Sequence, residues 1–350
     1  MQTTTQIAGR PIGPEHRPYV VAEMSGNHNG DIGRALALID AAKEAGADAV
    51  KLQTYTADTI TIDSDRPEFL IAGGLWDGRR LHELYREAHT PWDWHPQLFE
   101  HARSVGITIF STPFDFTAVD MLEALGAPAY KIASFEMVDT PLIERVAATG
   151  KPVIMSTGMA SLEEIEEAVS VARGAGCQNL VLLHCVSSYP APAEEANLRR
   201  IPELARRFGV LSGLSDHTMG HSVPVAAVAL GAVVIEKHFT LLRADGGVDS
   251  AFSLEKTELA ELVRMVGEVH AALGDGTFHV APAEAHNLQF RRSLFVVDDV
   301  PAGAPLTPAN VRSIRPGNGL APKHLKAVLG RPAARALKRG EPLAWDMIQD

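Results

Sequence analysis

Two histidines in this 350-residue chain have the side chains and the spacing to bind one metal ion. His217 follows the apolar run 210–214, and His238 follows the next such run, 233–237. If both runs are neighbouring parallel strands, the two imidazoles can share one divalent ion and leave several of its positions open. Such an ion polarises a carbonyl group as a Lewis acid. Because the chain has 14 histidines, chance pairs are common, and spacing alone does not decide for a metal.

Lysines and hydroxyl side chains occupy the ends of other apolar runs. Ammonium and hydroxyl groups together form a cradle that suits a phosphate and a carboxylate. The residues are Lys51, Thr112, Lys131, Ser134, Ser156 and Ser215. Walker-type and dinucleotide-binding glycine patterns are absent from the sequence, so we do not expect a nucleotide. A buried lysine on a barrel strand can also form a Schiff base, and this alternative for Lys131 stays open.

These side chains require a scaffold that brings many strand ends together. Short β-branched runs alternate with longer helical patterns such as 34–45, 161–172 and 255–273, which is typical of parallel strands with helical crossovers. Eight such units predict a closed (β/α)8 TIM barrel, whose active site lies at the C-terminal ends of the strands. The predicted strands are 19–23, 49–53, 108–111, 129–133, 152–156, 180–185, 210–214 and 233–237.

The remaining segments suggest an insertion and a second domain. Residues 54–91 exceed a usual strand-to-helix connection, and we expect them to shape the substrate site, with mere decoration as the alternative. We predict a barrel domain at 1–275, a linker at 276–290 and a small C-terminal domain at 291–350. A tail of about 60 residues has a marginal core, so we expect it to pack on the barrel or on a partner subunit; an idle appendage is the alternative.

Composition excludes several classes of partner. The formal charge of −11 is spread without a basic stripe, so neither nucleic acid nor an anionic membrane is an expected partner. No apolar stretch approaches the roughly 20 residues that span a bilayer, and the N-terminus lacks the apolar core of a signal peptide. Cys177 and Cys185 are interpreted as buried, reduced thiols. We therefore expect a cytoplasmic protein.

Taken together, the motifs at the strand ends make the chain resemble the sialic acid synthase family over nearly its whole length. The tail is similar to that family's antifreeze-like (SAF, β-clip) domain, through Arg291-Arg292-Ser293-Leu294, Arg315-Pro316-Gly317 and Gly319-Leu320. The barrel motifs are Ala22-Glu23, Asn27-His28-Asn29-Gly30, Ala45-Gly46-Ala47-Asp48-Ala49-Val50-Lys51, Lys131-Ile132-Ala133-Ser134, Ser156-Thr157-Gly158, Gly213-Leu214-Ser215-Asp216-His217, Glu236-Lys237-His238-Phe239 and Phe252-Ser253-Leu254.

The resemblance implies an enzyme that forms a C–C bond between phosphoenolpyruvate and an open-chain acylamino sugar. It implies a divalent metal, Mn2+ with Mg2+ or Co2+ as alternatives, bound by His217 and His238, and a domain-swapped homodimer in which Arg315 reaches the partner's sugar. The implied phosphoenolpyruvate-binding residues are Lys51, Thr112, Lys131, Ser134, Ser156, Ser187 and Ser215. The implied sugar-binding residues are Gln53, Tyr189, Asp249 and Arg315, and the implied catalytic residues are Glu23, Glu136, His217, His238 and Arg315.

One departure points to a branch of the family. Ser187 stands where a common sialic acid synthase has Asn, and this feature, with the segments 73–77 and 90–95, resembles the pseudaminic acid branch. The implied acceptor is 2,4-diacetamido-2,4,6-trideoxy-L-altrose. The alternatives are N-acetylmannosamine, for a sialic acid product, and 2,4-diacetamido-2,4,6-trideoxymannose, for a legionaminic acid product.

Two further alternatives belong to other classes. A metal-dependent or Schiff-base aldolase is the rival enzyme. A sugar-sensing or ice-binding protein with an inactive barrel is the rival without catalysis. The joint presence of His217, His238, Lys51 and Lys131 counts against an inactive barrel, because a binding protein has no need of all four.

Overall fold

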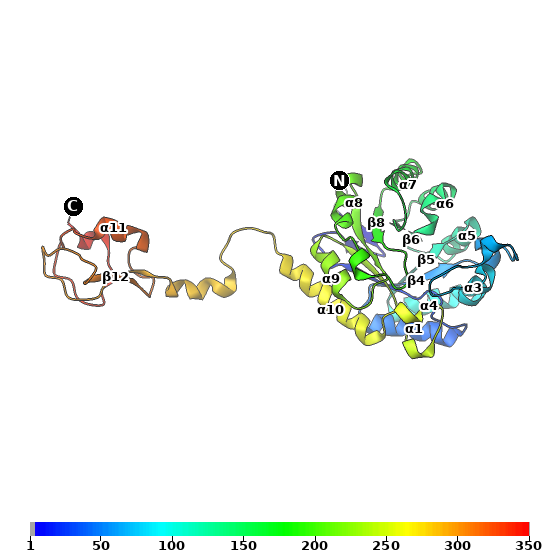
Figure 1. The fold of residues 1–350 in the computed structure, drawn as a ribbon, viewed down its shortest axis with the longest axis horizontal. Coiled ribbons are helices and arrows are strands. Elements are labelled where there is room, and N and C mark those ends of the chain that lie inside the picture. Colours follow the sequence, from blue (N-terminus) through cyan, green and yellow to red (C-terminus); the bar gives the residue numbers. More distant parts are fainter. Residues whose placement is uncertain (1–3, 350) are drawn as a thin grey trace. The chain divides into compact units, whose positions relative to one another are not determined.

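The computed structural model describes residues 4–349, and its central feature is a closed barrel of eight parallel strands (Figure 1). Around the barrel the order is β10-β3-β4-β5-β6-β7-β8-β9. The predicted TIM barrel is confirmed, and every predicted run overlaps one of its strands. The strands are β3 (Tyr19–Glu23), β4 (Ala49–Thr54), β5 (Thr108–Pro113), β6 (Tyr130–Ile132), β7 (Val153–Ser156), β8 (Leu180–Cys185), β9 (Leu211–Asp216) and β10 (Val234–His238).

Strand register brings the functional side chains to one level. His238 on β10 pairs with Glu23 on β3, and Glu23 pairs in turn with Lys51 on β4. Glu236 pairs with Ser215 on β9. Because side chains alternate between the two faces of a strand, residues two apart on a strand point the same way, toward the barrel interior or away from it.

A helix follows each barrel strand and covers the outside of the barrel (Figure 1). The capping box predicted at Ser161 and Glu164 is present at the start of α7. The predicted helix 34–45 corresponds to α1, which begins earlier because the Asp31 side chain caps it. The covering helices are α1 (Ile32–Glu44), α4 (His95–Val105), α5 (Phe116–Ala124), α6 (Thr140–Ala147), α7 (Leu162–Gly174), α8 (Arg200–Phe208), α9 (Ser222–Ala229) and α10 (Lys256–Leu273).

An N-terminal hairpin that the sequence analysis did not foresee contributes to the barrel core. It pairs β1 (Thr5–Ile7) with β2 (Arg10–Ile12) in antiparallel fashion. Ile7 and Ile12 are fully buried in the same apolar cluster as the side chains that fill the barrel interior. The hairpin therefore supplies part of the packing inside the barrel.

The long connection after β4 folds into short pieces. It contains α2 (Ala57–Ile60), α3 (Leu81–Ala88) and 3-10 turns at Pro67–Phe69 and Trp92–Trp94. Between α2 and α3, an antiparallel bridge joins Leu70 to Arg80 and closes a turn whose far end carries Trp76. Of the helices within residues 4–349, none is both long and apolar enough to cross a membrane.

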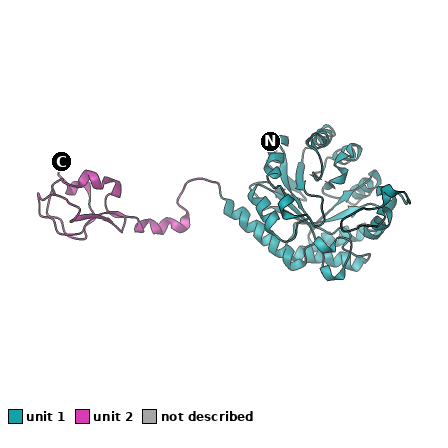
Figure 2. Ribbon diagram, viewed as in Figure 1, with its two compact units in different colours: residues 1–274 teal, residues 275–350 magenta. Residues whose placement is uncertain are grey.

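Contacts divide the chain into two compact units, residues 1–274 and 275–350 (Figure 2). The second unit has its own apolar core, which includes Leu294, Val311 and Leu343. The predicted linker at 276–290 stays a prediction; the structure forms a 3-10 helix at Pro282–Phe290 there. The other elements of this unit are β11 (Ser293–Val296), β12 (Val311–Ile314), α11 (Leu325–Val328) and 3-10 turns at Pro322–His324 and Trp345–Met347.

Candidate active site

A polar pocket opens at the C-terminal ends of the barrel strands. Every barrel strand contributes to it, either from its last residues or from the loop that follows. Most of the residues predicted for the site line this pocket. The lining residues are Glu23, Lys51, Gln53, Thr112, Lys131, Ala133, Ser134, Phe135, Ser156, Cys185, Tyr189, Ser215, His217, Glu236 and His238.

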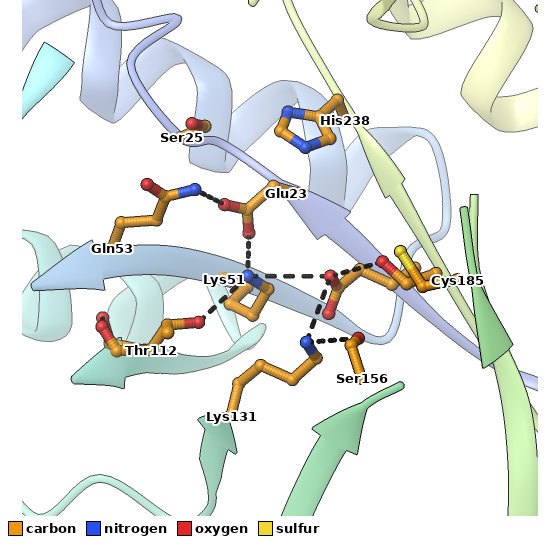
Figure 3. A network of polar contacts seen from close by, with 12 residues as sticks. Glu23, Ser25, Lys51, Gln53, Thr112, Lys131, Ser156, Cys185 and His238 are labelled. Carbon is orange, nitrogen blue, oxygen red and sulfur yellow. Dashed lines mark hydrogen bonds and ion pairs between the residues drawn. The ribbon is translucent and has the colours of Figure 1, made fainter. Parts of the chain in front are cut away.

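Two buried lysines and two buried carboxylates form the floor of the pocket (Figure 3). The Nζ of Lys51 lies 2.7 Å from Oε2 of Glu23 and 3.7 Å from Oε1 of Glu236. The Nζ of Lys131 lies 3.8 Å from the same oxygen of Glu236. Glu236 therefore stands between the two ammonium groups.

Hydroxyl groups complete the cradle around these charges. Lys51 donates to Oγ1 of Thr112 at 3.2 Å, and Lys131 donates to Oγ of Ser156 at 2.6 Å. Ser215 donates from Oγ to Glu236 at 3.1 Å. Ammonium and hydroxyl donors at this spacing can bind the oxygens of a phosphate or a carboxylate.

Burial and charge act against each other on this floor. Burial opposes the charge of Lys51, but the carboxylates of Glu23 and Glu236 outweigh it and raise the pKa of Lys51. For Glu236, Lys131 and Lys51 outweigh the cost of burial and lower its pKa. Burial dominates at Lys131 and lowers its pKa, although Glu236 opposes the shift. The floor thus holds separated charges in a low-dielectric site, where they interact strongly with an anionic ligand.

A glycine keeps one wall open. The backbone N–H of Gly158 donates to Oγ of Ser134 at 3.1 Å. A side chain at Gly158 would collide with the hydroxyls of both Ser134 and Ser187, which places those two hydroxyls side by side. Ser187 is half-buried at this wall, next to the pocket.

The two predicted metal ligands lie together. The ring centroids of His217 and His238 are 5.3 Å apart. Nδ1 of His217 lies 2.9 Å from the carbonyl oxygen of Val186, so a proton on Nδ1 leaves Nε2 with a free lone pair. Nδ1 of His238 is buried and has no hydrogen-bond partner among residues 4–349. An unpaired buried nitrogen is costly unless it gains a partner, and a divalent ion is a suitable one.

Charge favours the same interpretation for His238. Burial, with the positive charges of His217 and Lys51, holds the pKa of His238 well below its usual range. A neutral imidazole is the form that binds a metal. Within the described chain, no group of three His, Cys, Asp or Glu side chains converges as a metal cluster. The two imidazoles thus fit an ion whose remaining positions are filled by water or substrate.

Of the four residues predicted to bind the sugar, Gln53 and Tyr189 line the pocket and Asp249 lies beside it. The ring of Tyr189 lies 4.4 Å from that of His217, measured between centroids. Gln53 donates from Nε2 to Glu23 at 2.9 Å. Asp249 lies outside the lining; its carboxylate accepts a hydrogen bond from Ser25 and comes within 3.9 Å of Nδ1 of His238.

Glu136 lies beside the pocket, and the pKa of its carboxyl group is raised. Its Oε2 is buried and has no hydrogen-bond partner within residues 4–349. Burial raises the pKa of Glu136 to about 7, against the pull of Lys131. A carboxyl group with a pKa in this range can hold or release a proton near neutral pH.

Arg315 lies in the other compact unit, in the loop after β12. Its side chain is exposed. The loop is held by Ser293, whose Oγ donates to the carbonyl oxygen of Pro316 at 2.6 Å. The role predicted for Arg315 stays a prediction.

The structure adds four lining residues to which the sequence analysis gave no role: Glu236, Cys185, Ala133 and Phe135. The period of two along a strand could have indicated the first two, because Glu236 precedes His238 by two residues and Cys185 precedes Ser187 by two. Cys185 is buried, as expected, but its Sγ also lies 3.9 Å from Nδ1 of His217. For Phe135, which is 59% exposed, we find no sequence signal.

Comparison with known proteins agrees with this geometry. The sequence model of the NeuB family matches residues 38–278, and that of the SAF domain matches residues 291–349. The chain is 45% identical to the pseudaminic acid synthase of Helicobacter pylori, over 95% of this chain and 98% of that protein. It is 38% identical to an N,N'-diacetyllegionaminic acid synthase of Campylobacter jejuni, over 93% of this chain and 98% of that protein.

A solved structure shows the same fold. The N-acetylneuraminic acid synthetase of Leptospira borgpetersenii matches with a TM-score of 0.74 and 34% identity, over 82% of this chain and 96% of that one. The closed barrel and the polar pocket at the C-terminal ends of its strands are consistent with these matches in sequence and in structure. The chain therefore belongs to the NeuB family.

Proposed function

We propose that this protein is a pseudaminic acid synthase, which condenses phosphoenolpyruvate and water with 2,4-diacetamido-2,4,6-trideoxy-L-altrose to give pseudaminic acid and phosphate. The observation that carries the proposal is the juxtaposition of an anion cradle around Lys51 and Lys131 with the pair of imidazoles at one barrel mouth. The higher identity to a pseudaminic acid synthase than to a legionaminic acid synthase supports this acceptor.

Phosphoenolpyruvate suits the floor of the pocket. Its phosphate and carboxylate would accept hydrogen bonds from Lys51, Lys131, Thr112, Ser156 and Ser215. Ser134 and Ser187 extend the same wall beside Gly158. We assign these seven side chains to holding the phosphoenolpyruvate.

His217 and His238 would hold a divalent ion, for which we propose Mn2+, with Mg2+ or Co2+ as alternatives. When bound, the ion supplies Lewis-acid polarisation of the sugar aldehyde. The sugar would bind on the same side of the pocket, against Gln53 and Tyr189, with Asp249 behind His238.

The reaction joins C3 of phosphoenolpyruvate to the aldehyde carbon of the sugar. The aldehyde oxygen takes up a proton and becomes a hydroxyl group. Water adds at C2, which has gained cationic character, and loses a proton. The C2 hydroxyl then loses its proton and forms the keto group, while the C–O bond between C2 and the phosphate oxygen breaks and phosphate leaves with the bonding electrons.

We assign proton donation to Glu136. Its pKa of about 7 keeps a proton available near neutral pH, and its carboxyl group, next in sequence to the lining residue Phe135, would donate that proton to the new alkoxide. Glu23 is the alternative group for proton transfer, but its carboxylate is already bound by Lys51 and Gln53.

We further propose a domain-swapped homodimer in which Arg315 of one subunit binds the sugar of the other. Exposed apolar side chains on the loops around the pocket support a partner surface, because large apolar patches are costly in water. The loops after β6 and β7 carry Phe135, Val138 and Met159, which are 59%, 61% and 60% exposed.

A Schiff-base aldolase is the second candidate, and the lowered pKa of Lys131 favours it. Borohydride together with substrate would trap such an enzyme as a covalent adduct on Lys131. We expect no adduct, since the ammonium group of Lys131 is bound to Ser156 and lies near Glu236.

The experiment for the proposed reaction uses phosphoenolpyruvate labelled with 18O in the bridging position. With Mn2+ and the altrose derivative, we expect a product whose mass is that of the sugar plus pyruvic acid, and we expect the label in the released phosphate. Label retained in the sugar acid would contradict C–O cleavage. Phosphate release without a condensed product would contradict the synthase assignment.

A further inference from the structure

We infer that Trp76 is a positioning residue that sets the selectivity for the acceptor sugar. It contacts both Tyr189 in the pocket wall and the loop after β10 that carries Asp249. This inference rests on the proposed function, because it concerns the sugar side of the same pocket. Trp76 belongs to the long connection between β4 and α4, which the sequence analysis expects to shape the substrate site.

Trp76 is held at the end of a closed turn. The bridge between Leu70 and Arg80 forms its base, and a hydrogen bond from the N–H of Gly78 to the carbonyl oxygen of Ile71 shortens it. The Asp77 carboxylate accepts a hydrogen bond from the N–H of Gly73 at 2.5 Å. The turn therefore presents the Trp76 ring from a constrained backbone.

The first contact of Trp76 is with the pocket wall. Its ring lies 5.4 Å from that of Tyr189 between centroids. Tyr189 also contacts Phe252 at 5.3 Å and His217 at 4.4 Å. Because three rings surround Tyr189, its orientation in the pocket depends on all of them, and Trp76 is the one supplied by the long connection.

The second contact is with the loop after β10. Nε1 of Trp76 donates to the carbonyl oxygen of Val248 at 3.0 Å. Val248 is buried and precedes Asp249, whose carboxylate accepts from Ser25 and approaches His238. One indole ring thus fixes Tyr189 through packing and the Asp249 segment through a hydrogen bond.

The placement of Trp76 separates its effect from phosphoenolpyruvate binding. Trp76 is half-buried and is not among the residues that line the pocket, so it acts through Tyr189 and Val248. Lys51 and Lys131, on the floor, make their polar contacts with Glu23, Glu236, Thr112 and Ser156. A site discriminates between sugars only if the residues of its wall keep fixed positions. Trp76 fixes the wall that carries Tyr189 and the Asp249 segment.

The test compares Trp76→Ala and Trp76→Phe with wild type, using kcat/KM for three sugars: the altrose derivative, the legionaminic acid precursor and N-acetylmannosamine. Trp92→Phe is the matched control, since Trp92 belongs to the same connection and, within residues 4–349, makes no ring contact with Tyr189. We expect Trp76→Ala to raise the KM of the preferred sugar about tenfold and to narrow its selectivity over the others by a similar factor. Trp76→Phe keeps a ring but loses the hydrogen bond, so its KM and its selectivity should lie between those of wild type and Trp76→Ala.

The KM for phosphoenolpyruvate should stay within about twofold in all variants, and Trp92→Phe should keep wild-type selectivity. An equal fall in kcat/KM for all three sugars, or a matching rise in the KM for phosphoenolpyruvate, would overturn the inference. Selectivity is measured relative to whichever sugar the wild type prefers. If the acceptor assignment is wrong, the wild type will prefer another sugar. If the role of Trp76 is wrong, the wild-type preference will hold and only the Trp76 variants will fail to lose selectivity.

Discussion

Glu236 shows how a single side chain organises the anion-binding floor. Its Oε1 lies within 4 Å of both Lys51 and Lys131 and accepts from Ser215, so it fixes three donors at once. A carboxylate facing an anionic substrate opposes its binding electrostatically, and such a group is retained for positioning. We therefore expect a change at Glu236 to affect kcat more than the KM for phosphoenolpyruvate.

We therefore predict that Glu236→Gln lowers kcat by roughly tenfold or more, while the KM for phosphoenolpyruvate does not rise. The amide keeps the shape of the side chain but removes the charge that holds the two ammonium groups. Steady-state kinetics with phosphoenolpyruvate varied would measure both constants. An increased KM with unchanged kcat would show that Glu236 serves binding alone.

The pKa of Glu136 gives a prediction for pH dependence. If its protonated form donates to the new alkoxide, kcat/KM falls as the pH rises through about 7, and Glu136→Gln removes that inflection as well as most of the activity. Stability provides an independent readout. The folded protein retains a proton between the unfolded pKa of 4.5 and the folded pKa of about 7, so this carboxyl destabilises the fold progressively as the pH rises across that window.

Urea unfolding of wild type and Glu136→Gln between pH 5 and pH 8 would check the second part, and the variant should show a shallower decline. A wild-type profile of kcat/KM that is flat from pH 6 to pH 8 would contradict the role assigned to Glu136.

At the scale of elements, the sequence predicts the barrel well because its strands are continuous apolar runs with polar ends, such as Leu180–Cys185. The N-terminal hairpin was missed, since strands of three residues are too short for a periodic signal and only their apolar ends, such as Ile7 and Ile12, reveal burial. Glu236 and Cys185 were missed because the period of two was not applied to the strand ends; it places each of them on the same face as a predicted site residue two positions later.

The hairpin is predicted to stabilise the barrel through its buried isoleucines. Ile12 is fully buried in the cluster that fills the barrel interior, so Ile12→Ala should lower the free energy of unfolding by about 2–5 kcal/mol. Pro11, the exposed neighbour of Ile12 on β2, offers a control in Pro11→Ala, which should cost far less. Urea denaturation measures both. Equal, small effects would show that the hairpin does not contribute to the core.

At the scale of the whole molecule, the sequence indicates two domains but not how they meet, because the residues of a domain interface carry no periodic pattern. Arg315 illustrates this: its loop is well defined within its own unit, and the role predicted for it requires a partner subunit. The role of Arg315 at the partner's sugar was inferred from the resemblance to the family alone. It stays a prediction until an experiment tests it.

Complementation between two inactive variants tests it directly. Arg315→Ala and His238→Ala should each fold and each lose most activity. If Arg315 acts on the partner's site, mixing the two after subunit exchange should restore about a quarter of wild-type turnover, because half of randomly formed dimers are mixed and each has one intact site. Activity that stays at the level of the single variants would place Arg315 at its own subunit's site or outside the site.

The central claim is most directly tested by phosphate release from phosphoenolpyruvate with Mn2+, with the altrose derivative, the legionaminic acid precursor and N-acetylmannosamine offered in parallel and a chelator as control. We predict release that requires the metal and is most efficient with the altrose derivative. Preference for another sugar would contradict the acceptor assignment, and release with none of them would contradict the synthase assignment itself.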